Sequence, residues 1–231
     1  MAYMPIEVVT IGDIPTRDIS RALSVANAGQ DSFVFAKLSD VEAGPFRLHA
    51  YQNALASHIL DILERARSDI RGYHPFLIAV TDAHLDGDQY GNLFGSHRAE
   101  KGLAVVTTAN VPGIIVPADR LHSYFLYYFA RYVLSFIVPQ HRNHDDSRAC
   151  IFDRKVNKLD LLKSMRARAL CDICRLDLLS YPSSMSHAQF DAIERIFSLA
   201  SDAFQAVAQA RKPKIFIPSG PNWTAWRSFL P

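Results

Sequence analysis

Short runs of β-branched and aromatic residues alternate with amphipathic stretches in the first half of the chain, and this alternation limits the possible folds more than any other feature. The runs IEVVTIG (6–12) and SFVFAKL (32–38) enclose a stretch with helical spacing that ends at a glycine. From Arg47 to Arg67, apolar residues recur every three or four positions, which predicts a long amphipathic helix. The run HPFLIAVTDAHL (74–85) then predicts a buried strand. This order indicates an α/β fold in which helices flank a twisted mixed sheet.

The second half of the chain begins with a predicted hairpin-like pair of strands at 90–111 and then becomes helical. Asp119 is a candidate cap for a helix that Pro139 ends, and the aromatic stripe YFLYYFARY inside this helix is typical of core. Further helices are predicted at 158–169 and from Ser186 to residue 211. The aromatic, proline-rich segment 212–231 is expected to dock on a surface.

Three cysteines and a histidine-rich segment form the strongest chemical signal. Cys171 and Cys174 lie in a CxxC motif, and twenty residues separate this motif from Cys150. Zinc prefers four tetrahedral nitrogen or sulfur ligands, and a CxxC turn supplies two of them on one side. His144 is the preferred fourth ligand, with His141 and Asp145 as alternatives. We therefore predict one structural zinc ion, while buried free thiols and a redox CxxC remain alternative interpretations.

Charge and segment composition narrow the class of protein. The chain has 25 Lys and Arg against 23 Asp and Glu, so its net charge of +2 provides no global field for a polyanion. Basic residues do gather around the candidate zinc site, but aspartates alternate with them, which disfavours nucleic-acid binding; this cluster is Arg154, Lys155, Lys158, Lys163, Arg166, Arg168 and Arg175. The N-terminus resembles no signal peptide and no apolar run reaches membrane-spanning length, so we expect a soluble cytoplasmic protein.

The order of these motifs resembles the archaemetzincins, a family of metzincin-type zinc metallopeptidases. The similarity runs from about Pro45 to Leu179 and includes VTDAHL, NLFGSH, GLAVVTT, CIF and CDIC. It implies a metzincin-like domain over residues 1–180, with a zinc knuckle at about 141–179. It also implies that the C-terminal helix and tail, 181–231, pack on the same domain.

The family's catalytic motif is HExxHxxGxxHC. After four further residues it is followed by a second motif, CxM. Aligning CxM with Cys150–Phe152 places Leu134, Ser135 and Val138 where the family has its first histidine, its glutamate and its second histidine. His144 then matches the third histidine, His141 the glycine and Asp145 the cysteine. A catalytic zinc needs about three protein ligands, and the chain contains no HExxH. The resemblance therefore implies a pseudo-enzyme that keeps only the structural zinc.

Two classes of function follow from this interpretation. In the first, the chain is an inactive module that binds a protein or an extended peptide by strand addition, for which Leu103–Thr108 is the predicted edge. In the second, it is a hydrolase that uses unrelated residues of the same cleft. A weak nucleic-acid-binding zinc module is a further alternative.

Overall fold

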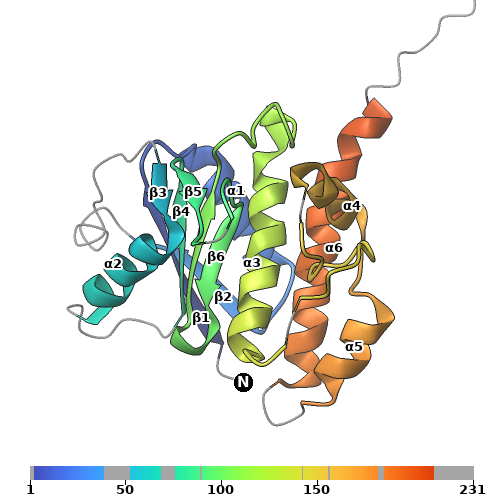
Figure 1. The fold of residues 1–231 in the computed structure, drawn as a ribbon. Coiled ribbons are helices and arrows are strands. Elements are labelled where there is room, and N and C mark those ends of the chain that lie inside the picture. Colours follow the sequence, from blue (N-terminus) through green and yellow to red (C-terminus); the bar gives the residue numbers. More distant parts are fainter. Residues whose placement is uncertain are drawn as a thin grey trace, which may run out of the picture.

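A five-stranded mixed sheet forms the centre of the molecule (Figure 1). The computed structural model describes residues 3–38, 53–68, 76–88, 90–141, 143–155, 157–181 and 185–210. The strands of the sheet are, in spatial order, β2 (Phe33–Lys37), β1 (Met4–Ile11), β4 (Phe76–Thr81), β7 (Leu103–Thr107) and β6 (Gly95–Arg98). Neighbouring strands are parallel except β6, which runs antiparallel to β7. The predicted α/β class and the hairpin-like pair are confirmed.

Helices cover both faces of the sheet. On one face lies α2 (Ala56–Ser68), together with the two-stranded ribbon β3–β5 (Asn53–Leu55 and His84–Asp86). On the other face lie α1 (Thr16–Ala28) and α3 (Leu121–Ile137), and behind α3 stand α4 (Leu161–Arg166), α5 (Asp172–Leu179) and α6 (His187–Ala210), as Figure 1 shows. Short 3₁₀ turns complete the described elements at Ala99–Lys101, Ala118–Arg120 and Lys158–Asp160.

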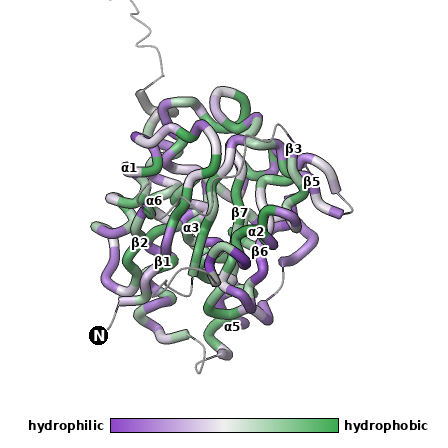
Figure 2. Tube along the Cα trace, turned by 90° about the vertical axis from the view of Figure 1, so that its left-hand side faces the viewer, coloured by the Kyte–Doolittle hydropathy of each residue, from purple (hydrophilic) through white to green (hydrophobic). Residues whose placement is uncertain are grey.

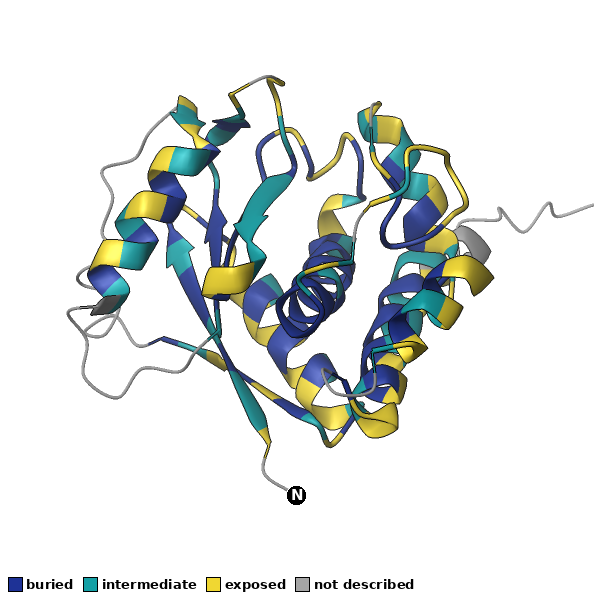
Figure 3. Cartoon of the chain, turned by 60° about the horizontal axis from the view of Figure 1, so that its bottom comes forward, coloured by how far each residue is buried: buried dark blue, intermediate teal, exposed yellow. Residues whose placement is uncertain are grey.

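Helix α3 is the centre of the main core, which confirms the interpretation of its aromatic stripe. It is buried along almost its whole length (Figure 3), and Arg131 is its only residue outside the buried class. Buried tyrosine hydroxyls need partners, and two of them fix the helix on β7. Tyr124 donates to the Thr107 carbonyl at 2.7 Å, and Tyr132 donates to the Val105 carbonyl at 3.0 Å. A side chain at Gly95 would meet the Tyr132 hydroxyl, so β6 needs glycine there.

The predicted sheet edge is wrong. Strand β7 lies between β4 and β6 and all five of its residues are buried, whereas β6 is the last strand of the sheet among the described residues. Figure 2 shows the same contrast, with β7 hydrophobic and β6 hydrophilic. An apolar strand such as 103–107 belongs in the interior because both of its faces are covered. The edge on this side of the sheet is therefore Gly95–Arg98.

Two helix starts also differ from expectation. Helix α2 begins only at Ala56, because Asn53–Leu55 pair with His84–Asp86 as parallel strands; residues 47–52 lie outside the described part of the chain. Asp119 does not cap α3, since it lies in a 3₁₀ turn and the helix starts without a side-chain cap.

The start of α6 does match its prediction. The Ser186 hydroxyl accepts from the Gln189 N–H at 3.3 Å, and Gln189 Oε1 accepts from the Ser186 N–H at 2.9 Å, which is a capping box. Docking of segment 212–231 falls outside the described residues and stays a prediction, as does the division of the chain at residue 180. No helix among the described residues is long and apolar enough to cross a membrane.

Candidate metal centre and cleft

Four side chains from three separate segments converge beside α5. The sulfur atoms of Cys150, Cys171 and Cys174 and a ring nitrogen of His144 all lie within 4.8 Å of one another. Cys171 directly precedes α5 and Cys174 lies in its first turn, so the start of this helix aims both thiols at one point. Three thiols and an imidazole are the donor set of a structural zinc site, and this cluster is suited to holding one zinc ion. The assignment of these four residues as its ligands stays a prediction.

The orientation of His144 fits this role. Its Nε2 lies 3.7 Å from Cys171 Sγ, so this nitrogen faces the thiols. On the other side of the ring, Nδ1 lies 2.9 Å from the Asp146 carbonyl and 3.2 Å from Asp153 Oδ1. A carboxylate behind a metal-binding histidine fixes its tautomer and raises its basicity. His144 is thus presented with Nε2 free for a metal.

Asp153 is a functional residue that sequence reasoning missed. It is only 1% exposed and its carboxylate accepts N–H groups from Arg148 at 3.1 Å and Cys150 at 3.0 Å. The Ser164 hydroxyl donates to the same carboxylate at 3.2 Å. These bonds fold the turn that carries Cys150, including Ala149 in the left-handed region at φ 56°. The sequence signal was the residue type alone, because aspartate side chains often hydrogen-bond to nearby backbone N–H groups in turns.

Two of the thiols share a hydrogen bond. The hydrogen bond from Cys174 Sγ lowers the pKa of Cys150, and the same pairing raises the pKa of Cys174. Adjacent thiolates repel each other, so a second ionisation is opposed unless a cation lies between them. A zinc ion would supply that cation and hold every ligating thiol as a thiolate.

Both alternatives for the fourth ligand lie elsewhere. His141 Nδ1 is 2.6 Å from Asp177 Oδ2, and its ring packs edge-on against Phe152 with centroids 4.3 Å apart. Asp145 is 86% exposed on its side chain and pairs with Arg154 at 3.2 Å. Among the described residues, neither belongs to the group of converging side chains that could hold a metal ion, whereas His144 does.

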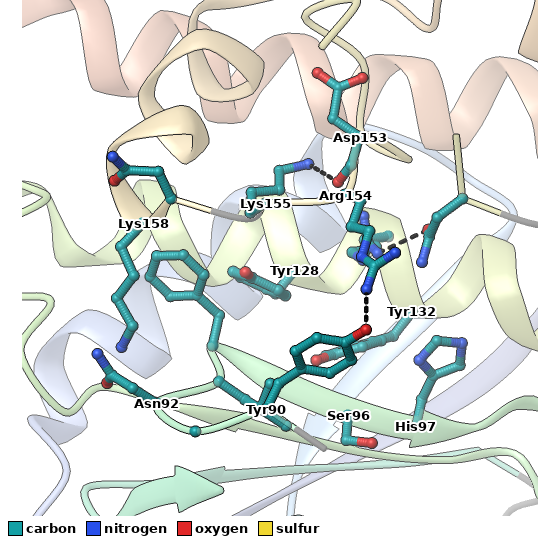
Figure 4. Close-up of a pocket in the computed structure, with 17 residues that line it drawn as sticks. Tyr90, Asn92, Ser96, His97, Tyr128, Tyr132, Asp153, Arg154, Lys155 and Lys158 are labelled. Atoms are coloured by element: carbon teal, nitrogen blue, oxygen red, sulfur yellow. Dashed lines mark hydrogen bonds between the residues drawn. The ribbon is translucent and has the colours of Figure 1, made fainter. Parts of the chain in front are cut away.

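A cleft of about 1000 Å³ opens between β6, α3 and the segment 143–158 (Figure 4). Strand β6 contributes Gly95, Ser96 and His97, and helix α3 contributes Tyr128, Arg131 and Tyr132. Burial, followed by the charge of Arg131, lowers the pKa of His97 to about 4, so this ring is neutral near pH 7. A smaller adjoining cavity of about 410 Å³ is lined by Ser135 and His141 among others.

The predicted positions of the catalytic motif are not supported by this geometry. Leu134 and Val138 are 0% exposed in the main core, so they do not face the cleft as expected, although Ser135 lines the smaller cavity. The helix residues that do reach the two cavities are Tyr128, Arg131, Tyr132 and Ser135, at the spacing of one helix face. The alignment assumed a fixed distance to Cys150 and took no account of which face of α3 reaches the cleft.

The basic cluster around the zinc candidate is not one surface. Arg154, Lys155 and Lys158 line the cleft. By contrast, Lys163 pairs with Asp160, Arg168 with Asp202 and Arg175 with Glu194. These exposed or half-exposed pairs divide the predicted cluster into a cationic cleft and an ordinary charged exterior.

Solved structures that resemble this chain include a zinc-dependent peptidase and an archaemetzincin. A zinc-dependent peptidase from Methanocorpusculum labreanum matches with a TM-score of 0.57 and 16% sequence identity, over 74% of this chain and 99% of that chain. The archaemetzincin from Methanopyrus kandleri matches with a TM-score of 0.52 and 15% identity, over 78% of this chain and 97% of that chain. No protein-family model and no curated protein matches the sequence. The chain thus has the archaemetzincin fold, as the motif order predicted.

A prediction follows for Asp153. Asp153→Asn keeps the size of the side chain but removes the charge that faces His144 and the Cys150 turn. We expect zinc affinity to fall by about 10- to 100-fold, the usual effect of removing a partner behind a metal ligand. Competition with a chromophoric zinc chelator measures this. Asp146→Asn is the matched control, because Asp146 is 61% exposed on its side chain and its carboxylate lies farther from His144, at 3.7 Å; equal losses in both variants would contradict the assigned role.

Proposed function

We propose that this chain is a metzincin-type scaffold that holds one structural zinc ion at Cys150, Cys171, Cys174 and His144. Its cleft binds an extended peptide and lacks the metal site needed for metallopeptidase chemistry. The proposal rests mainly on the α3 residues that line the two cavities. None of these residues is a histidine or carries a carboxylate. The site assignment, the peptide partner and the absence of catalysis are parts of one proposal.

The catalytic motif supports this proposal when it is aligned by the helix face instead of by the distance to Cys150. In that register the first histidine, the glutamate and the second histidine correspond to Arg131, Tyr132 and Ser135. The third histidine, ten residues after the first, corresponds to His141, which lines the same small cavity as Ser135. One imidazole cannot hold a catalytic zinc, and neither tyrosine nor serine replaces the carboxylate base.

Peptide binding is supported by the edge of the sheet. Strand β6 is hydrogen-bonded to β7 on one side only, within the described chain, and three of its four residues line the cleft. An extended peptide can pair with such an edge through its main chain while alternate side chains enter the cleft. This moves the predicted docking strand from 103–108 to 95–98.

The test is a joint measurement of metal content and hydrolysis. We expect one zinc ion per chain by elemental analysis of protein purified without added metal, and no cleavage of a casein or mixed-peptide substrate. Near-zero zinc would contradict the structural site. Two zinc ions per chain together with chelator-sensitive cleavage would contradict the loss of catalysis.

A second candidate, a hydrolase that uses other residues of the cleft, has one specific observation in its favour. His141 is bound by Asp177 through Nδ1, and its buried Nε2 has no partner among the described residues. Ser135 lines the same cavity, so an acid, a base and a hydroxyl are present there. However, the Ser135 hydroxyl donates to the Arg131 carbonyl at 3.0 Å, as a structural helix serine does. Chelator-resistant ester hydrolysis that Ser135→Ala abolishes would favour this candidate.

A further inference from the structure

The cleft beside β6 carries positive charge that no carboxylate inside it balances. Four basic side chains line it: Arg131, Arg154, Lys155 and Lys158. Asp153 is the one acidic residue among its described lining residues. Figure 4 shows that the carboxylate of Asp153 points away from the cleft. Its oxygens are occupied by Cys150, Arg148 and Ser164, on the side of the metal cluster.

Two of these basic groups have no firmly held carboxylate partner among the described residues. The Lys158 Nζ is buried over the Phe94 ring, 4.7 Å from its centroid, and has no hydrogen-bond partner among the described residues. Burial lowers its pKa below the ordinary lysine value, which an arriving anion would reverse. Arg154 lies over the Tyr90 ring and donates to the Tyr90 hydroxyl at 2.5 Å. Among the described residues its carboxylate contact is with the highly exposed Asp145, and such an exposed pair is weak and readily exchanged.

The other two cations already have partners of their own. Arg131 donates to the Ile151 carbonyl and to Asn143 Oδ1. Lys155 donates to the Asp153 carbonyl at 2.7 Å. Burial lowers the pKa of Lys155 to about 6, so near pH 7 it is Arg131 that adds positive potential to the cleft, while both groups hold the turn that carries Cys150 in place.

Strand β6 indicates that the anion belongs to a peptide. Within the described chain the outer edge of β6 is unpaired, and its alternating main-chain donors and acceptors match those of an extended peptide, whereas a nucleic acid offers no such matching main chain. A long polyanion would also need a basic track beyond the cleft, but Lys163, Arg168 and Arg175 outside it are paired with acids. Side chains of a strand alternate, so every second residue of a peptide on β6 would point toward α3 and segment 154–158.

We propose that the cleft selects an acidic extended peptide, which pairs with β6 and places Asp or Glu carboxylates against Arg154 and Lys158. This inference rests on the proposed peptide-binding function and names its substrate class. Charge-assisted hydrogen bonds to half-buried cations are stronger than those between neutral groups, and charge also accelerates encounter. The preference should therefore weaken as salt is added.

The experiment uses the full chain with its zinc and three blocked, dye-labelled decapeptides in fluorescence anisotropy. One alternates Glu with Thr, the second replaces every Glu with Gln, and the third replaces every Glu with Lys. We expect the Glu peptide to bind about 10-fold more tightly than the Gln peptide at low salt, with this advantage shrinking at about 0.3 M salt. The Lys peptide should bind most weakly.

Charge variants locate the effect. The double variant Arg154→Gln and Lys158→Gln should reduce the advantage of the Glu peptide to about 2-fold or less, because both proposed partners lose their charge. Lys163→Gln changes the net charge in the same direction but lies outside the cleft lining, so it should leave the advantage unchanged.

Each result that contradicts the proposal identifies which part of it fails. Equal binding of the Glu and Gln peptides would overturn the acidic preference and leave peptide binding in place. Loss of the preference in Lys163→Gln as well would overturn its location in the cleft. If no decapeptide binds but inorganic tripolyphosphate or a single-stranded oligonucleotide does, the cleft serves another anion and the inference is wrong. If none of these probes binds, the proposed peptide-binding function fails too.

Discussion

Cys174→Ser is expected to lower the melting temperature by about 10 °C or more and to reduce the yield of soluble protein. The Cys174 side chain is 2% exposed and lies in the first turn of α5. Its loss removes one of the four converging donors and one of the two thiols that would anchor the start of this helix to the metal. Apparent zinc-binding free energies at structural sites are about 10 kcal/mol or more, and that energy is folding energy. Losing about half of this binding free energy lowers the melting temperature of a domain of this size by roughly 10–20 °C.

A chelator separates metal loss from simple packing loss at Cys174. Thermal denaturation is followed by circular dichroism with and without a strong zinc chelator, for the unmodified chain and for the variant. We expect the chelator to lower the melting temperature of the unmodified chain toward that of the variant, and to change the variant little. Equal lowering in both proteins, or a variant that melts like the unmodified chain, would show that Cys174 does not stabilise the fold through zinc.

The second large effect concerns the register of the lost catalytic motif. Arg131→His combined with Ser135→His places two imidazoles on the α3 face that reaches the two cavities, near His141. We expect this variant to bind a second zinc ion, since three histidines are a sufficient protein ligand set. Leu134→His combined with Val138→His should instead prevent stable folding. Both native side chains are 0% exposed in the core, and replacing each costs about 2–5 kcal/mol out of a total stability of about 5–15 kcal/mol.

Zinc per chain and the thermal transition decide between the two registers. A cooperative melt and a second zinc ion in the Leu134 and Val138 variant would restore the register based on the distance to Cys150. If the Arg131 and Ser135 variant folds but binds one zinc ion only, the three side chains do not converge. Adding His141→Ala to that variant is the control, and it should remove the second zinc ion.

Local patterning of the sequence determined the fold class and most of the elements. The β-branched runs became β1, β2, β4 and β7, and the aromatic stripe became the buried helix α3, because side-chain periodicity records which faces are covered. The long helix predicted from Arg47 is the exception, since its described part begins at Ala56. There, pairing of Asn53–Leu55 with β5 outweighed the local helical pattern, and pairing between distant segments is invisible to periodicity.

Cysteine spacing likewise predicted the metal centre, because a CxxC turn and one distant cysteine already restrict where thiols can meet. The sequence already favoured His144 as the fourth side chain, but only the tertiary structure separated it from His141 and Asp145 and placed Asp153 behind it. The same holds for the sheet edge at β6 and for the face of α3 that reaches the cleft. Each of these depends on how segments far apart in the chain pack together, and one sequence carries no direct record of such contacts. The residue types for a zinc site were thus evident from the sequence, whereas the shape and charge of the cleft were decided only by the packing of α3, β6 and segment 143–158.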